Sequence, residues 1–302
     1  MIGIRPTVDF AFKLMLGNPE HTTVTIHFLN AILGDRPKIT HVEILNPFLG
    51  KEAEKDKLSV LDILATDEHD RKLNIEMQTT LPAGISQRLA YYAARLYVTQ
   101  LAEGGRYPAL RPAISNCVLS KAMFPGIPNL HLDFRLREST GQLLTDDLQI
   151  HLLELSKLRV SAQNVYHASP MERWAYFLQN AEKLTHAEVE QMFPDREFTE
   201  AAGVLEMISQ TPEQQRQYDA RLKFQLDEAA RLEFAREQAL REGEEKGRVE
   251  GRREGKLLGR IAILQELLGV EEPTSTELSS YNEDQLSELA EQLQGQLRNR
   301  GQ

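Results

Sequence analysis

The sequence predicts an α/β core followed by an all-helical extension. Two amphipathic segments open the chain, and strand-like segments with one long helix among them follow, up to about residue 155. After about residue 165, the periodic segments have helical spacing only. This order is typical of a sheet packed on helices, with further helices appended. With 302 residues, of which 41% are apolar, the chain is long enough for two or three compact units.

The two N-terminal segments are predicted helices because their apolar residues recur at helical spacing. In the first, "VDFAFKLMLG", Phe10 and Leu14 lie one turn apart, and the break "GNP" at residues 17–19 ends the helix. The second, "EHTTVTIHFLNAILG", ends at Gly34.

Six segments have strand character, and one long helix interrupts them. The predicted strands are residues 39–45, 58–66, 71–79, 113–120, 130–138 and 148–155. The break "PAG" at 82–84 leads into the helix "ISQRLAYYAARLYVTQLAEG". We therefore divide the chain into a core of residues 1–160, a helical region of residues 161–242 and a C-terminal part of residues 243–302.

The second and third predicted strands place carboxylates in apolar surroundings. In "RKLNIEMQT", the polar residues Asn74, Glu76 and Gln78 alternate with apolar ones and share one face of the strand. If residues 68–70 form a three-residue hairpin loop, Asp62 lies directly opposite Glu76. A four-residue loop would instead put these two carboxylates on opposite faces of the sheet.

Two carboxylates that face each other on a sheet repel unless a cation compensates them. A divalent cation with oxygen ligands is the natural compensation. The alternative is a polar strand face in contact with water, on which the two carboxylates are incidental. Asp62 favours a site, because the residues on both sides of it are apolar and a buried carboxylate needs a partner.

Composition restricts the classes of function. The net charge is −10, but residues 1–125 carry +1 and the remainder carries −11, so a basic groove could still exist in the N-terminal part. No apolar stretch is long enough to span a membrane, and the N-terminus lacks the layout of a signal peptide. The single cysteine, Cys117, indicates a reduced thiol in a cytoplasmic protein. The eight histidines are dispersed, which argues against zinc, and no phosphate-binding glycine loop is present.

Four blocks of the sequence, in order, resemble the PD-(D/E)XK nuclease superfamily. They are "DFAFKLML", "KLSVLDILATDEHDRKLNIEMQ", "QRLAYYAARLYVTQLAEGGRYPALRPAISNCVL" and "EGEEKGRVEGRREG". The resemblance is to the Rpn-type branch, the recombination-promoting nucleases that are also described as transposases. It implies a restriction-endonuclease-like core, with a mixed sheet flanked by helices, and a metal-dependent DNA endonuclease activity.

The resemblance also implies roles for single residues. Asp62 and Glu76 match the two acidic metal-ligand positions, and the carbonyl of Ile75 or Met77 could complete the shell. Gln78 stands where the superfamily usually has a lysine, which leaves open what polarises the attacking water. Lys57 could supply the missing charge, or it could be a lysine at the edge of a strand. Two carboxylates with retained waters suit Mg²⁺, and Mn²⁺ or Ca²⁺ could take its place.

Two sets of residues are candidates for contact with DNA. Asp9 and Lys13 match the first block of the family, although they could simply form a surface ion pair one turn apart. On the long helix, a set of arginines and tyrosines at helical spacing shares one face and suits phosphate and base contacts. Its members are Arg88, Tyr91, Tyr92 and Arg95. The tyrosines of this face could equally pack on the sheet.

The C-terminal part combines a glycine repeat with an amphipathic tail. Glycine recurs every four residues from Gly243 to Gly259, either as a face where a second helix approaches closely or as a flexible charged spacer. Two amphipathic helices follow, the second with Asn282 as N-cap. We expect a homo-oligomer formed through this part. The alternative to a nuclease is an inactive helical interaction protein that retains the fold.

Overall fold

The computed structural model describes residues 1–34, 37–45, 63–270 and 273–300. The chain divides into two compact units, Met1–Ala229 and Ala230–Gln302. Asp62 and Lys57 lie outside the described residues. No helix in the described ranges is both long and apolar enough to be a candidate for crossing a membrane.

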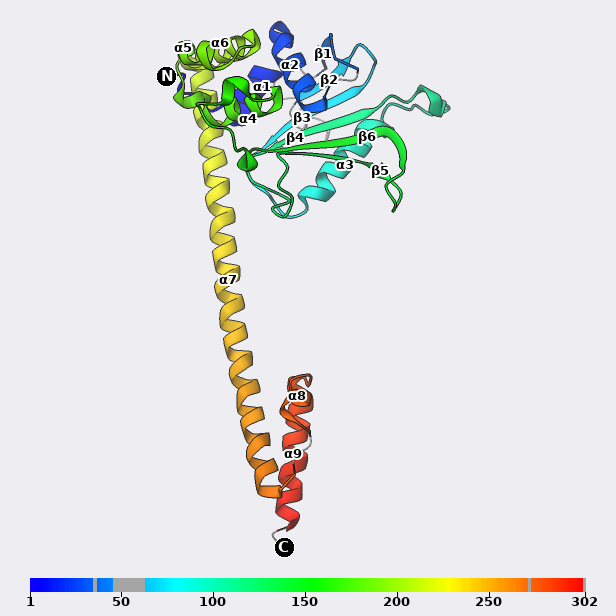
Figure 1. Cartoon of the computed structure of the whole chain (residues 1–302), viewed down its shortest axis with the longest axis vertical. Helices are drawn as coiled ribbons and strands as arrows, with labels where there is room; N and C mark the ends of the chain where they lie inside the picture. Colours follow the sequence, from blue (N-terminus) through cyan, green and yellow to red (C-terminus); the bar gives the residue numbers. More distant parts are fainter. Residues whose placement is uncertain (35–36, 46–62, 271–272, 301–302) are drawn as a thin grey trace. The chain divides into compact units, whose positions relative to one another are not determined.

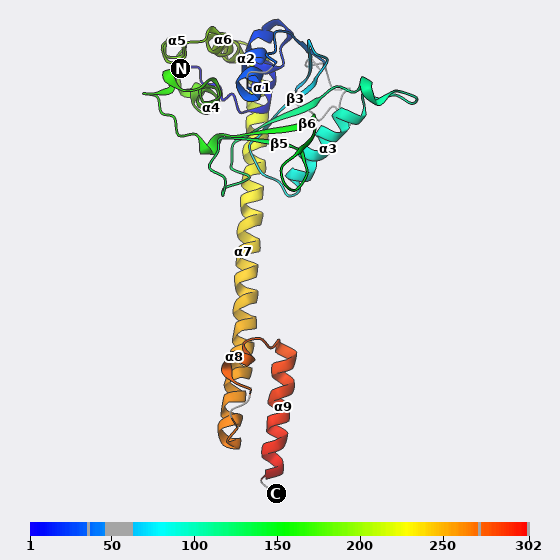
Figure 2. The ribbon, with the colours of Figure 1, turned by 45° about the vertical axis from the view of Figure 1, so that its right-hand side comes forward.

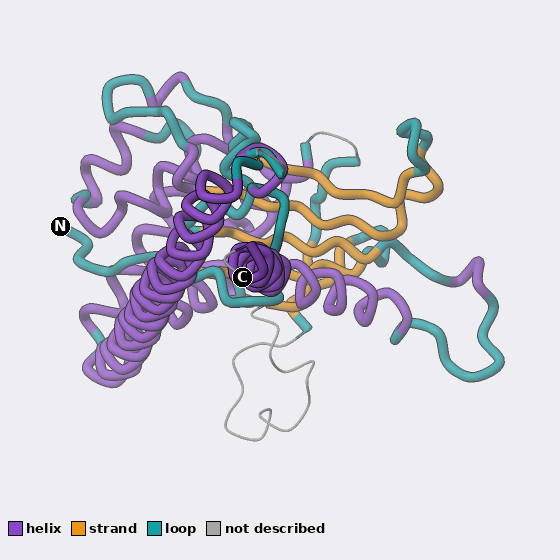
Figure 3. The backbone as a smooth tube through the Cα atoms, turned by 90° about the horizontal axis from the view of Figure 1, so that it is seen from below, coloured by secondary structure: helices purple, strands orange, loops and turns teal. Residues whose placement is uncertain are grey.

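The first unit is built on one mixed sheet, with the strand order β1-β2-β3-β4-β6-β5 (Figure 1, Figure 3). The outer pairs β1–β2, β2–β3 and β5–β6 are antiparallel, whereas β3, β4 and β6 run parallel to one another. The strands are β1 (Val42–Ile44), β2 (Ile63–Asp67), β3 (Lys72–Gln78), β4 (Ala113–Leu119), β5 (His131–Arg137) and β6 (Leu143–Glu154). The predicted α/β core is thus confirmed, and β6 begins five residues before the predicted strand.

The crossover helix α3 (Ile85–Val98) joins the parallel strands β3 and β4 and covers one face of the sheet. Its buried residues Ile85 and Leu89 pack against Cys117 of β4, and Leu132 and Leu152 belong to the same cluster. Two parallel strands need such a crossover, because the chain must return to the starting end of the sheet before the second strand begins, and a tight turn is too short for that. Helix α3 therefore lies over the face of β3 that contains Asn74, Glu76 and Gln78.

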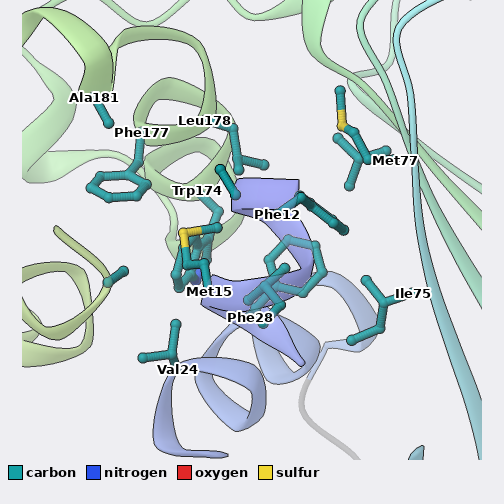
Figure 4. Close-up of a cluster of buried hydrophobic side chains, with 14 of the residues drawn as sticks. Phe12, Met15, Val24, Phe28, Ile75, Met77, Trp174, Phe177, Leu178 and Ala181 are labelled. Carbon is teal, nitrogen blue, oxygen red and sulfur yellow. The ribbon is translucent and has the colours of Figure 1, made fainter. Parts of the chain in front are cut away.

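The opposite face of the sheet packs against α1 (Asp9–Leu16) and α2 (Thr22–Leu33). Figure 4 shows Phe12 of α1 and Phe28 of α2 beside Ile75 of β3. Helix α1 ends at Gly17, where a Cβ atom would lie 2.7 Å from the carbonyl oxygen of Lys13 and 3.1 Å from the side chain of Ile63. This close approach explains why glycine ends the helix against the sheet.

Helices α4 to α6 continue the same core, although the sequence placed them in a separate region. They are α4 (Pro170–Asn180), α5 (His186–Met192) and α6 (Arg196–Gln210). Trp174 of α4 is fully buried, and its ring meets Phe28 edge-to-face at 5.5 Å and Phe198 at 4.5 Å. Ser169 and Thr185 cap α4 and α5 through reciprocal bonds with a glutamate three residues on.

The helix α7 (Pro212–Leu268) begins in the first unit, where Tyr218 Oη accepts a hydrogen bond from the backbone N–H of Arg5. In the second unit, the end of α7 packs with the short α8 (Ser275–Leu278) and with α9 (Glu283–Arg300) (Figure 1, Figure 2). Ile261, Leu286 and Ala290 are fully buried in this small core. The predicted N-cap Asn282 is confirmed, because its Oδ1 accepts from the N–H of Gln285 at 2.9 Å.

The glycine repeat lies inside α7, so the glycines do not interrupt the helix. All five are exposed, and a Cβ atom at any of them would meet nothing within 4 Å. The first of the two predicted tail helices is the end of α7 itself, and the second is α9. The contact face and the spacer therefore both stay predictions.

Candidate active site

The β2–β3 hairpin has the loop length on which the predicted carboxylate pair depends. Thr66 pairs with Lys72, so the loop holds three residues, Glu68 to Asp70, as predicted. Asp67 Oδ1 accepts from the N–H groups of His69 and Arg71, both at 3.0 Å, which fixes the turn. Asp70 takes the left-handed conformation that such a tight turn requires, with φ of 60°.

The last described pair of residues in this hairpin is Ile63 and Ile75. The predicted pair of Asp62 and Glu76 would be the next one. Glu76 is within the described strand, but Asp62 and Lys57 are not. The facing of Asp62 and Glu76 therefore stays a prediction, and so does the role of Lys57.

The polar face of β3 is buried rather than wet. Asn74 is 1% exposed and Glu76 is 3% exposed, and Gln78 at the end of the strand is half-buried. Their neighbours on the parallel strand β4 are Ser115, Cys117 and Leu119, on the face that α3 covers. The alternative of a solvated strand face does not hold for Asn74 and Glu76.

Glu76 is held by two donors on one of its oxygens. Gln78 Nε2 donates to Glu76 Oε1 at 2.6 Å, and the NH2 group of Arg88 donates to the same oxygen at 3.0 Å. The other oxygen, Oε2, is buried and has no hydrogen-bond partner among the described residues. Glu76 thus presents one occupied and one unoccupied carboxylate oxygen.

The pKa of Glu76 is raised, chiefly because burial penalises the charged carboxylate. The charge of Arg88 opposes this shift, as do the side-chain hydrogen bonds from Gln78 and Arg88. Arg88 compensates the carboxylate at Oε1, and a cation at the unpartnered Oε2 would stabilise the charged form further.

Asn74 was missed as a site residue by sequence reasoning. Its Nδ2 lies 3.4 Å from Ser115 Oγ, and its Oδ1 is buried without a hydrogen-bond partner in the described part of the chain. Only its alternation with Glu76 and Gln78 could have indicated it, because asparagine is unfavourable in a buried strand unless it has a polar partner.

Arg88 is the DNA-contact candidate on α3 that contacts Glu76. Arg88 and Glu76 form an ion pair, and the Arg88 side chain is 33% exposed. Tyr91 is 50% exposed, its ring lies 5.7 Å from that of Tyr92, and its hydroxyl accepts from Arg95 at 3.4 Å. The sequence analysis did not predict the contact of Arg88 with Glu76, and the contact of this helix face with DNA stays a prediction.

Asp9 and Lys13 form an ion pair, one of the two predicted alternatives, with 2.9 Å between Asp9 Oδ1 and Lys13 Nζ. The pair spans one turn of α1. Buried residues of this helix, such as Phe12, pack in the core that contains Ile75, which belongs to the face of β3 opposite to Glu76. Their contact with DNA stays a prediction.

The described residues by themselves do not form a complete metal centre. No group of three or more His, Cys, Asp or Glu side chains that could hold a metal ion occurs among them. The bare Oε2 of Glu76 nevertheless fits a hard cation, since carboxylate oxygens are the ligands that Mg²⁺ and Ca²⁺ prefer. Asp62, the predicted second ligand, lies outside the described residues.

Comparison with known proteins gives the family. Searches among curated proteins and among solved structures found no match. The model of one protein family, described as the PD-(D/E)XK nuclease family transposase, matches residues 6–235, which is most of the chain. The match spans the sheet, α3 and helices α4 to α6, and it includes Glu76 and Gln78. The chain therefore belongs to the PD-(D/E)XK nuclease family of transposases.

Proposed function

We propose that the protein is a metal-dependent DNA endonuclease that hydrolyses phosphodiester bonds. The observation that carries the proposal is the carboxylate of Glu76, which is buried on the sheet with Oε1 held by two donors and Oε2 left bare. Membership of a nuclease family makes DNA the expected substrate. A buried carboxylate oxygen without a partner is unfavourable in a purely structural role and favourable as a cation ligand.

The ligands of the cation would be Glu76, through Oε2, and Asp62. We favour Mg²⁺, and Mn²⁺ or Ca²⁺ could occupy the same oxygens. When bound, such an ion lowers the pKa of a coordinated water and offsets the negative charge that develops on the phosphate. The binding site for it is preorganised by Gln78 and Arg88, which fix the carboxylate plane of Glu76.

Gln78 cannot act as the charged lysine that usually stands at its position. Its amide is neutral and is already used, because Nε2 donates to Glu76 at 2.6 Å. We propose that Gln78 is a positioning residue that keeps Glu76 Oε2 turned toward the cation. Lys57 is the second candidate for the missing positive charge.

A plasmid-nicking assay tests the function. The wild-type protein should nick supercoiled DNA with Mg²⁺ and should stop when the ion is chelated. Asp62→Ala and Glu76→Gln should each lose at least about 10²-fold in rate, because each removes a metal ligand. The matched control is Glu103→Gln, an exposed glutamate that should leave the rate unchanged.

Equal cleavage by the wild type and both site variants would place the chemistry elsewhere. If the wild type cleaves with none of Mg²⁺, Mn²⁺ and Ca²⁺, the second candidate function holds, which is an inactive interaction protein that retains the fold. We also propose that cleavage has little sequence preference, because the candidate contacts are mostly of the phosphate type. A strict recognition sequence in mapped cut sites would contradict this.

We further propose that the chain forms a homo-oligomer through residues after about 225. The described length of α7 carries exposed apolar side chains in its middle, including Leu232, Phe234 and Leu240. The open glycine face from Gly243 to Gly259 would let a second helix approach closely. Light scattering should give a larger particle for the full chain than for a chain truncated at residue 225. A monomeric full chain at tens of micromolar would refute the proposal.

A further inference from the structure

The acidic site needs a positive charge that β3 does not supply. A phosphodiester brings negative charge to carboxylates, and this charge grows in the transition state of hydrolysis. The described cation on the same face of β3, Lys72, donates to Thr66 Oγ1 at 3.1 Å. Lys72 lies four residues before Glu76, a distance of about 13 Å along a strand, so it does not serve the site.

Arg88 reaches the site from α3 instead. Its NH2 group contacts Glu76 Oε1 at 3.0 Å, and this is a contact with one oxygen only. A guanidinium carries five N–H donors in a planar fork, so one contact leaves most of them available. The exposed fraction of 33% shows that the side chain also borders solvent, where a substrate could approach.

The Nε atom of Arg88 gives a second indication that this side chain binds substrate. This atom is buried and has no hydrogen-bond partner within the described ranges. A buried donor without an acceptor costs about 1–3 kcal/mol, so packing alone would not favour this arrangement. The unpartnered Nε lies in the same guanidinium whose NH2 group contacts the metal-ligand candidate Glu76. An acceptor that arrives with the substrate would satisfy it.

We propose that Arg88 is a catalytic residue that binds a non-bridging oxygen of the phosphate to be cleaved. The inference rests on the proposed nuclease function and names the residue that meets the substrate's charge there. One N–H of the guanidinium holds Glu76. The side chain, which is 33% exposed, shifts on substrate binding so that the buried Nε–H and a neighbouring N–H bind the phosphate as a fork. Arg88 keeps its protons throughout. The oxygen of a water forms a bond to phosphorus and gives up one proton to solvent, while the bond to the leaving oxygen breaks and that oxygen takes up one proton from solvent. Arg88 balances the charge on the non-bridging oxygens during this exchange.

Single-turnover cleavage of a short duplex by Arg88→Ala and Arg88→Lys tests this. Arg88→Ala should lower the maximal rate by about 10²–10³-fold, the usual loss when one transition-state donor is removed. Arg88→Lys should retain an intermediate rate, since it keeps the charge but loses the fork. Low concentrations of guanidinium ion should restore part of the rate of Arg88→Ala. The matched control is Arg137→Ala, which removes another arginine, one that donates to a backbone carbonyl on the β5–β6 hairpin.

Calorimetric titration with Mn²⁺ in the absence of DNA gives a readout independent of cleavage. Arg88→Ala should still bind Mn²⁺, because both proposed ligands remain and the loss of a nearby cation offsets the loss of one donor to Glu76. Loss of Mn²⁺ binding would overturn the proposal, because Arg88 would then act only by holding Glu76. A rate equal to that of Arg137→Ala, or no rescue by guanidinium, would also overturn it.

The same experiments separate this inference from the proposed function. Cleavage by the wild type that is lost on chelation and in Glu76→Gln supports the nuclease, whatever Arg88→Ala does. A full rate in Arg88→Ala then overturns the role of Arg88 alone. A wild type that does not cleave with any divalent cation overturns the nuclease function.

Discussion

The two faces of strand β3 are equally buried but chemically opposite. Leu73, Ile75 and Met77 enter a core with the large aromatic side chains of α1 and α2. Asn74 and Glu76, on the other face, lie under α3 with buried polar atoms that lack partners among the described residues. The first face resembles the interior of any globular domain. The second face lowers the stability of the fold, because burying polar groups without partners costs free energy. Where a fold retains such a face, function rather than packing is the expected reason.

The largest expected effect is a difference in the free energy of unfolding between variants of two neighbouring residues, one on each face of β3. Ile75→Ala should lower the free energy of unfolding by about 2–5 kcal/mol, because it leaves a cavity in a close-packed core. Glu76→Gln should change the stability less, because the amide keeps the shape and removes a desolvated charge, and because Arg88, which is 33% exposed, can be solvated by water. Denaturant unfolding of both variants measures the difference. A larger loss in Glu76→Gln than in Ile75→Ala would show that the polar face is structural.

The two variants should also rank in the reverse order for activity. Ile75→Ala, assayed at a temperature where it is folded, should keep most of the cleavage rate, while Glu76→Gln should lose it. Circular dichroism on the same samples confirms that each variant is folded. Similar activity losses in both would indicate that the site depends on packing more than on its carboxylate.

A smaller effect is expected for the residue that only orients Glu76. Gln78→Ala removes the 2.6 Å hydrogen bond but leaves Arg88 on the same oxygen. We expect a loss of about 10-fold in cleavage rate and in metal affinity, the lower limit for a residue that orients a ligand. Gln78→Glu is the matched variant, because it keeps the size but repels Glu76, and it should lose more. If Gln78→Ala equals the wild type, Arg88 alone positions the carboxylate.

The smallest effect concerns the hairpin loop, which fixes the register of both faces. Glu68 accepts hydrogen bonds from Thr40 N, Thr40 Oγ1 and His41 N, and these bonds lower its pKa to about 2, against the opposing effect of desolvation. A lowered pKa stabilises the fold above the ordinary value near 4.5, and this contribution disappears as the pH falls toward 2. Glu68→Gln should therefore be less stable than the wild type at pH 7.

The difference in stability between Glu68→Gln and the wild type should shrink as the pH falls below 4.5. Thermal unfolding of both proteins between pH 7 and pH 3 measures it. Glu103→Gln, a substitution of an exposed loop glutamate, serves as the control for a general charge effect. A difference that does not depend on pH would mean that the shape of Glu68, rather than its charge, supports the hairpin.

Much of the fold could be predicted from the sequence because its signals are local. The alternation in residues 71–79 and the helical spacing after residue 82 were sufficient to place β3 and α3. The short polar loop after residue 66 predicted a hairpin but left a three-residue and a four-residue loop open, and the structure has the three-residue one. The N-cap Asn282 was predicted because a cap acts within one turn of its helix.

What the sequence could not decide depends on contacts between distant residues. It did not show that α4 to α6 join the core of α1 and α2, because that packing brings Trp174 to Phe28. It did not show whether the polar face of β3 is wet or covered, since burial depends on where α3 crosses the sheet.

The contact between Arg88 and Glu76 joins residues that are 12 positions apart and lie on two different elements. The spacing of residues along β3 or along α3 alone does not predict this contact. By itself, the sequence determined the elements and the acidic candidates, because these follow from local periodicity. Only the tertiary structure decided which oxygen of Glu76 is occupied and which is bare, because hydrogen bonds depend on atoms meeting in space.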